Sequence, residues 1–256
     1  MKALQHAAQY ASDPYDFNFV FTQCLSPGKS ARDFVIPVGE SLIHFVALGG
    51  KMSSIEMLIS SHSIHVDLQM QSGWTPLMYA LLPKYHSDNL YGLGTLRQSV
   101  QVAKLLLSYD ANPVIITSDG WTPLYALALH MEPDLNGLAR SLPLELISCG
   151  APVDSPVPSL SLKHQTSVMG KVFQNPGAQW RNLPLSHFAA QHGAVGVVRA
   201  LIESGANVVK RDKYGQTPVD AAVESESLKA RDLRSAVVAV LDEALENEFE
   251  KVVEGV

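Results

Sequence analysis

Apolar residues along this chain recur at helical spacing in short stretches that polar turns separate. The stretches from Val100 to Leu107 and from Val195 to Ile202 each place apolar side chains on one face of a helix. Shorter apolar stretches begin at Thr-Pro pairs, where threonine can accept a hydrogen bond from a backbone N–H and proline needs no donor of its own. The pattern predicts helix starts at Thr75-Pro76, Thr122-Pro123 and Thr217-Pro218.

A short motif recurs at these helix starts. Gly-Trp-Thr-Pro-Leu occurs at 73–77 and again at 120–124, and Gly-Gln-Thr-Pro-Val occurs at 215–219. The equivalent turn positions are Gly39, Gly73, Gly120, Asn182 and Gly215, which are 34, 47, 62 and 33 residues apart. One unit of turn, helix, turn and helix is therefore used about five times, as in repeat proteins.

The fullest second half of a unit runs from Ala189 to Asn207, through a Gly-Ala turn and an apolar helix that ends in Gly205-Ala-Asn. With the Gly-x-Thr-Pro-Leu starts, it resembles the ankyrin repeat, whose period is about 33 residues. The resemblance implies an all-α solenoid of helix pairs, with short β-hairpin or loop fingers and helical caps at both ends. It also implies that His44 and His187 occupy the structural histidine position of that family.

This resemblance gives one domain with irregular units. We expect an N-terminal cap at 1–38 and a C-terminal capping helix at 226–256, and the repeats fall at 39–72, 73–119, 120–181, 182–214 and 215–225. Extra residues form inserts near 83–99, 131–139 and 155–179. In the last helix, Val237, Leu241, Leu245 and Phe249 are spaced by four and predict a stripe that faces the core.

Composition and charge limit the function. Apolar residues make up 46% of the chain and charged residues 17%, which favours a folded protein. The net charge of -6 argues against nucleic acid as a partner. With no long apolar segment, we expect no membrane association.

No residue pattern indicates catalysis or metal binding. Cys24 and Cys149 do not have the spacing of a disulfide framework or a zinc site, and His62 and His65 are better explained as turn residues than as metal ligands. We therefore expect no catalytic residues, no metal and no cofactor. The two cysteines favour a reducing compartment, which predicts a cytoplasmic protein, with a nuclear location or a secreted effector as alternatives.

The resemblance to ankyrin repeats also implies a binding surface on the finger tips and on the inner helices. Carried over position by position, the partner-binding residues are Gln71, Trp74, Leu82, Ser118, Trp121, Leu129, His130, Trp180, Arg181, His192, Lys213 and Tyr214. The position after the turn glycine is expected to face solvent, so Trp74 and Trp121 would be neighbouring hot spots in one groove. The alternative is that each tryptophan packs on its own finger and stiffens the stack.

The leading hypothesis is a non-enzymatic protein interaction module that holds an extended segment or a helix of another protein in a Trp-lined concave groove. One alternative is that the inserts roof the groove into an apolar pocket for a small molecule, with binding or catalysis by residues such as His130 and Arg181 beside Tyr85, Tyr91 and Met131. Another is a pathogen effector or an inhibitory subunit. The sequence leaves these alternatives open.

Overall fold

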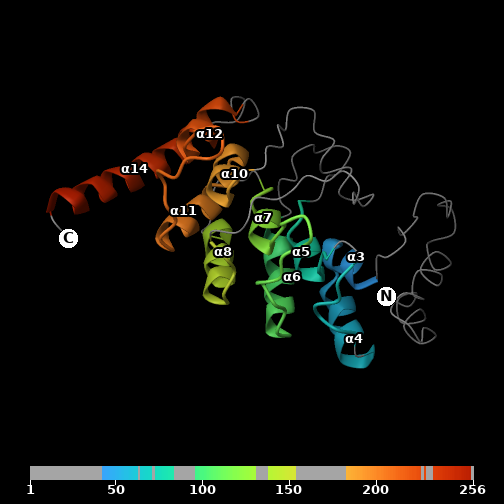
Figure 1. Cartoon of the computed structure of the whole chain (residues 1–256). Helices are drawn as coiled ribbons and strands as arrows, with labels where there is room; N and C mark the ends of the chain where they lie inside the picture. Colours follow the sequence, from blue (N-terminus) through green and yellow to red (C-terminus); the bar gives the residue numbers. More distant parts are fainter. Residues whose placement is uncertain are drawn as a thin grey trace.

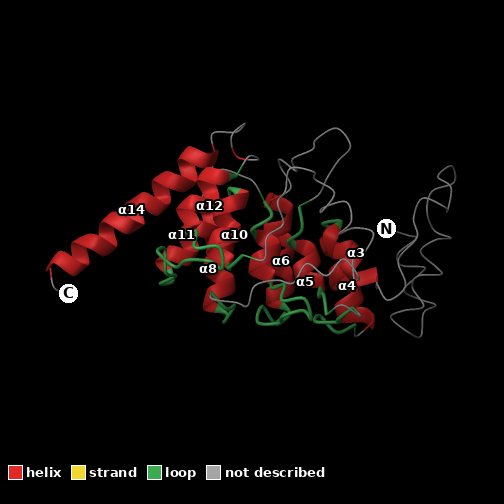
Figure 2. Ribbon diagram, turned by 45° about the horizontal axis from the view of Figure 1, so that its top comes forward, coloured by secondary structure: helices red, strands yellow, loops and turns green. Residues whose placement is uncertain are grey.

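The computed structural model describes residues 42–62, 64–70, 73–83, 96–130, 138–153, 183–225, 228 and 233–254. The predicted N-terminal cap and most residues of the three predicted inserts lie outside these ranges. All regular secondary structure within them is helical, and no β-strand occurs there (Figure 2). The helices are α3 Leu42–Leu48, α4 Met52–His62, α5 Pro76–Ala80, α6 Leu96–Ser108, α7 Pro123–Leu127, α8 Leu138–Ser148, α10 Leu185–His192, α11 Val195–Glu203, α12 Pro218–Glu224 and α14 Leu233–Glu254.

The helices pack as pairs that follow one another along the chain (Figure 1). The first helices of the pairs form one row, in which α3 packs on α5, α5 on α7, α7 on α10 and α10 on α12. The second helices form another row, in which α6 packs on α8, α8 on α11 and α11 on α14. The buried apolar side chains of both rows make one continuous core.

The Thr-Pro pairs begin helices as predicted. The hydroxyl groups of Thr75, Thr122 and Thr217 each accept a hydrogen bond from the backbone N–H three residues later, and a proline occupies the first helical turn in each case. Thr217 also forms a capping box with Asp220, whose carboxylate accepts the backbone N–H of Thr217 at 2.8 Å. The burial of this carboxylate is slight, and its hydrogen bonds to Thr217 hold the pKa of Asp220 below its ordinary value.

Two helices begin before the residues that the insert bounds suggest. The insert expected at 83–99 ends earlier, because α6 begins at Leu96 rather than at Val100. Likewise α8 begins at Leu138, inside the insert expected at 131–139. In both helices the first turn precedes the apolar residues that the pattern detects, so the periodicity alone places the start too late.

The stripe predicted for the last helix is buried over only part of its length. Val237 and Leu241 are fully buried, whereas Phe249 is 70% exposed. The reason is that α14, with 22 residues, is longer than the neighbouring α11, which has nine and therefore cannot cover the whole stripe. The core-facing role predicted for Phe249 was therefore wrong, and Figure 1 shows α14 running outward to the C-terminus.

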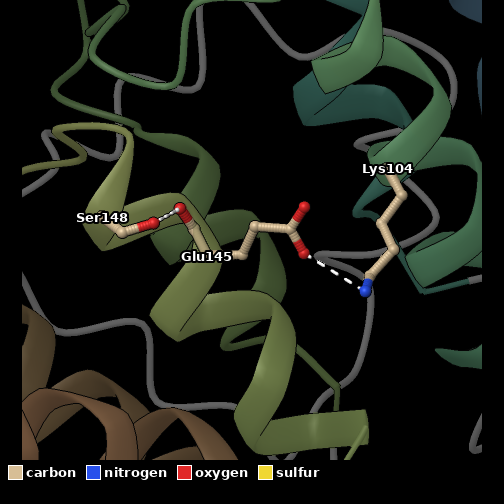
Figure 3. Close-up of polar contacts among 3 residues, drawn as sticks. All are labelled: Lys104, Glu145 and Ser148. Atoms are coloured by element: carbon tan, nitrogen blue, oxygen red, sulfur yellow. Dashed lines mark hydrogen bonds and ion pairs between the residues drawn. The ribbon is translucent and has the colours of Figure 1, made fainter.

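Polar contacts on the surface also join neighbouring pairs. The Lys104 ammonium on α6 lies 3.3 Å from the Glu145 carboxylate on α8 (Figure 3). Arg140 on α8 lies 2.8 Å from Glu203 on α11. Among the described helices, none is both long and apolar enough to cross a membrane.

Candidate functional site

The loops that join successive helix pairs are the candidate site. We call residues 64–75 finger 1, 111–122 finger 2 and 206–217 finger 4; finger 3 corresponds to 151–183, most of which lies outside the described residues. Figure 2 shows finger loops together below α4, α5 and α6. Fingers 1 and 2 are close neighbours, because a Cβ atom on Gly73 would lie 3.2 Å from the Cα atom of Thr117.

The three described fingers share one backbone turn. In each, the residue three positions before the glycine donates its N–H to the carbonyl after the glycine, at 3.0 Å for Met70 to Trp74, 2.9 Å for Thr117 to Trp121 and 2.9 Å for Asp212 to Gln216. The glycines Gly73, Gly120 and Gly215 have φ between 80° and 86°, which other residues rarely adopt. Because the fingers share this hydrogen bond and this glycine conformation, we compare what their described side chains present to solvent.

One side-chain position links three of the helix pairs to the next finger. His44 Nε2 lies 3.1 Å from the Trp74 carbonyl oxygen, and His187 Nε2 lies 2.9 Å from that of Gln216. Tyr125, at the equivalent position, donates its hydroxyl to the Leu183 carbonyl at 2.9 Å. These contacts brace the fingers as the family resemblance implied for His44 and His187. Met78 occupies the same position in its unit and has no hydrogen to donate.

The two tryptophans of fingers 1 and 2 are neighbours, as predicted, but they do not face solvent. Trp74 and Trp121 are each 3% exposed, and their ring centroids lie 5.5 Å apart. Their rings also meet buried aromatic rings of the first-helix row, with Trp74 6.0 Å from Tyr79 and Trp121 5.9 Å from Phe188. The expectation of a solvent-facing hot spot was wrong, because the next unit supplies an aromatic partner that buries the ring.

Four further predicted contact residues are also buried. Leu82, Leu129 and His130 lie within three residues after the first helices α5 and α7, and His192 is the last residue of α10; all four are at most 5% exposed. Helices α5 and α7 have five residues each, all of them buried, so the chain that follows them still lies within the core. His130 Nε2 lies 2.9 Å from the Leu81 carbonyl, which gives it a structural contact. The predicted residues Gln71, Trp180 and Arg181 lie outside the described residues.

Burial also keeps two histidines of α10 neutral. It lowers the pKa of His192 to about 4, against a hydrogen bond to the Phe188 carbonyl that acts in the opposite direction. The imidazole of His192 stacks on the Phe188 ring at 4.1 Å. Burial likewise lowers the pKa of His187. Both side chains therefore support the fold at neutral pH and present no charge to a partner.

The finger tips carry exposed apolar side chains that the sequence reasoning missed. Val114 and Ile116 on finger 2 are 45% and 43% exposed, and Val209 on finger 4 is 51% exposed. Of the predicted contacts, Ser118, Lys213 and Tyr214 are exposed on the same two fingers. The available signal was the presence of β-branched residues in loops that otherwise hold polar and turn residues. Exposed apolar residues that gather on one feature mark interaction surfaces.

Finger 4 is also basic. Lys210, Arg211 and Lys213 are exposed, while Asp212 between them is buried. The Asp212 carboxylate accepts the backbone N–H groups of Tyr214 at 2.8 Å and Gln216 at 3.0 Å, so its charge is used inside the turn. The Lys213 ammonium lies 5.0 Å from the centre of the Tyr214 ring. In a chain with a net charge of -6, this tip favours an acidic partner.

Comparison with known proteins agrees with the repeat pattern. A model of the ankyrin repeat matches residues 72–118 and 183–213, so the chain contains ankyrin repeats. The chain is similar to the palmitoyltransferase ZDHHC13 of Mus musculus, with 25% identity over 229 residues that cover 81% of this chain. It is also similar to the proteins of that name from Pongo abelii and Homo sapiens, at 24% identity. The chain spans about a third of these relatives, since the match covers 32% of each.

Proposed function

Since the chain contains ankyrin repeats, we propose that it is a protein interaction module whose contact surface is formed by the tips of fingers 2 and 4. The observation that carries this proposal is the clustering of exposed apolar residues. Val114, Ile116, Val209 and Tyr214 are all on these two fingers, at positions where the fold needs no apolar side chain.

The partner is best described as an extended segment that runs along the fingers. The contact surface changes in character along the stack, from the apolar tip of finger 2 to the basic tip of finger 4. Neighbouring helices pack about 8–10 Å apart, so two units separate these tips by about 20 Å. An extended chain spans that distance with about six residues. We propose a partner segment with an apolar anchor and, about six residues away, a cluster of carboxylates.

The groove that the sequence suggested is replaced by this surface. Trp74 and Trp121 support binding indirectly, because their packed rings hold fingers 1 and 2 together. Trp180, Arg181 and Gln71 stay as predicted contacts. The relatives carry the name of a palmitoyltransferase and this chain spans about a third of their length; we propose that this chain serves protein recognition rather than a transfer step.

The test compares tip variants with a matched control in affinity capture from a lysate of the source organism. The Val114→Ser/Ile116→Ser and Lys213→Ala/Tyr214→Ala variants should each lose proteins that the native chain captures. The Met52→Ser/Val223→Ser control removes equally exposed apolar side chains away from the fingers, since Met52 is 40% and Val223 48% exposed. It should capture the native set.

All three variants should melt near the native temperature, because substitutions of exposed side chains usually change stability by less than about 0.5 kcal/mol. Capture of the same proteins by both tip variants and the native chain would contradict the proposal. If the Met52→Ser/Val223→Ser control also lost these proteins, capture would depend on exposed apolar residues in general and not on the finger tips, which would likewise contradict the proposal.

A further inference from the structure

The last helix extends beyond the stack that it covers. Its first half buries Leu233, Val237, Val240, Leu241 and Ala244 against α11 and α12. Residues 246–250 are all exposed. We call residues 246–254 the α14 overhang. At a rise of 1.5 Å per residue, these nine residues extend about 13 Å. Figures 1 and 2 both show α14 leaving the other helices before it reaches the C-terminus.

The overhang combines an exposed aromatic ring with carboxylates. Phe249 follows Leu245 by four residues, so it continues the stripe with which α14 packs on the stack. Glu246 lies one turn before Phe249, and Glu250 is four residues from Glu246, so that two like charges are neighbours beside the ring. Carboxylates are also unfavourable near the C-terminus of a helix. A surface with an apolar centre and cations around it would bury the Phe249 ring. Its cations would also offset the repulsion between Glu246 and Glu250 and their unfavourable position near the C-terminus of the helix.

Finger 4 has that composition. Its exposed apolar side chains are Val209 and Tyr214, and Lys210, Arg211 and Lys213 surround them in the sequence. The buried and hydrogen-bonded Asp212 does not offset these cations at the surface. Within one chain the overhang does not cover this tip, since Phe249 is 70% exposed and Tyr214 56% exposed.

Both surfaces lie at the same end of the stack. Finger 4 begins after Glu203, where α11 ends, and α11 packs against α14. Figures 1 and 2 place the overhang on the side of the stack where α11 ends. Two copies related by a two-fold axis can therefore form the same contact twice, which closes the assembly as a dimer.

We propose that the occupant of this surface is a second copy of the chain, and that the α14 overhang of each copy docks on finger 4 of the other. Phe249 packs against Val209 and Tyr214, while Glu246 and Glu250 face Arg211 and Lys213. The inference does not depend on binding of another protein, and it uses finger 4 without finger 2. Because both proposals use finger 4, the overhang and the partner segment proposed above would occupy that tip one at a time.

The test measures the oligomeric state by sedimentation velocity across about 1 µM to about 500 µM protein, the range of moderate affinities. The native chain should show a reversible monomer to dimer transition that weakens as salt is added, because exposed charges are screened. Glu246→Lys/Glu250→Lys and Arg211→Glu/Lys213→Glu should each raise the dimer Kd at least about tenfold, since each replaces attraction by repulsion in both contacts.

Mixing these two variants should restore dimers. In the mixed pair, the basic overhang of one copy meets the acidic finger of the other, and the acidic overhang of the second meets the basic finger of the first. Phe249→Ser should also weaken the dimer and, being an exposed substitution, should leave the melting temperature unchanged. Glu56→Lys, an exposed charge reversal on α4, is the matched control and should leave the Kd unchanged.

A native chain that stays monomeric throughout the concentration range would overturn the proposal. So would a native dimer that neither charge reversal weakens, or a mixture of the two variants that stays monomeric while both are folded by circular dichroism. The Val114→Ser/Ile116→Ser variant should dimerise normally even where it loses other captured proteins, which separates this inference from the proposed function.

Discussion

Two junctions between helix pairs have the same finger backbone and different side chains. In the aromatic junction, made by Trp74, Met78 and Trp121, the rings after the turn glycines pack at 5.5 Å and are buried. In the polar junction, made by His187, Asp212 and Gln216, the residue after the glycine is partly exposed and its carbonyl lies 2.9 Å from His187 Nε2. The two tryptophan rings thus meet at the junction whose bracing position holds Met78, which has no hydrogen to donate.

The comparison shows that an equivalent sequence position can serve the core or the surface. Trp121 and Gln216 each follow a turn glycine with the same backbone, but only Trp121 meets rings from both neighbouring units, Trp74 and Phe188. A side chain in this position is buried where the adjacent units supply aromatic partners. The aromatic junction should therefore contribute most to stability, and helix α10, which carries His187 of the polar junction and also His192, should respond most to pH.

The largest expected effect is the loss of a ring from the aromatic junction. Trp121→Ala should lower the free energy of unfolding by about 3–5 kcal/mol, because it removes a buried ring and leaves a cavity among Trp74, Tyr125 and Phe188. Gln216→Ala at the equivalent position should cost less than about 1 kcal/mol. Urea unfolding followed by circular dichroism measures both. Equal losses for the two variants would show that the junctions do not differ as described.

The next effect is a loss of stability in mild acid. Folded His192 keeps a pKa of about 4, whereas an unfolded histidine has its ordinary value of 6.5. Below pH 6.5 the unfolded chain binds a proton that the folded chain does not, so stability falls as the pH falls from 6.5 towards 4. At about 1.4 kcal/mol for each pH unit, the full difference amounts to about 3 kcal/mol.

His192→Gln should remove most of this acid-dependent loss, and the measurement is the urea midpoint at pH 7.5 and pH 5. If His192→Gln retains the native difference, burial of His192 is not its source.

A smaller loss of stability is expected when the contact between His187 and the Gln216 carbonyl is removed. His187→Ala removes the contact to the Gln216 carbonyl, which still accepts the Asp212 N–H at 2.9 Å. Since one hydrogen bond of two is lost, stability should fall by about 1–2 kcal/mol. Hydrogen exchange should become faster in finger 4 and remain unchanged in finger 2. Faster exchange in both fingers at once would mean that the units do not open separately.

Local patterns predicted the parts of the fold that depend on local physics. Thr-Pro pairs begin helices wherever they occur here, because the threonine hydroxyl and the proline ring act within one turn. The motif spacing also led to the resemblance to ankyrin repeats, and a model of that repeat matches residues 72–118 and 183–213. By contrast, the burial of Trp121 depends on Trp74 and Phe188 from other units, and one unit of sequence does not contain that information.

The candidate site was harder to predict for the same reason. Lys213 and Tyr214 were predicted because the finger tips of the family are expected to be exposed, and both are exposed. Leu129 and His192 are instead buried by the neighbouring units. Phe249 fits a core stripe by its spacing, but its exposure depends on where α11 ends. Periodicity identifies the side of a helix that is apolar, and the length of the neighbouring helix decides how much of that side is covered.

The smallest expected effect concerns the ion pair outside the aromatic junction. Lys104 and Glu145 join α6 to α8 at 3.3 Å, and their side chains are 48% and 36% exposed (Figure 3). Solvent screens such a pair, so a double-mutant cycle of Lys104→Ala and Glu145→Ala should give a coupling of about 0.2–1 kcal/mol that decreases in high salt. The buried rings of Trp74 and Trp121 join the same two units. A coupling free energy as large as the loss of stability in Trp121→Ala would mean that the ion pair between α6 and α8, and not the ring contact, is the main link between these units. We expect the buried rings to dominate, because they act where water and salt do not weaken the contact.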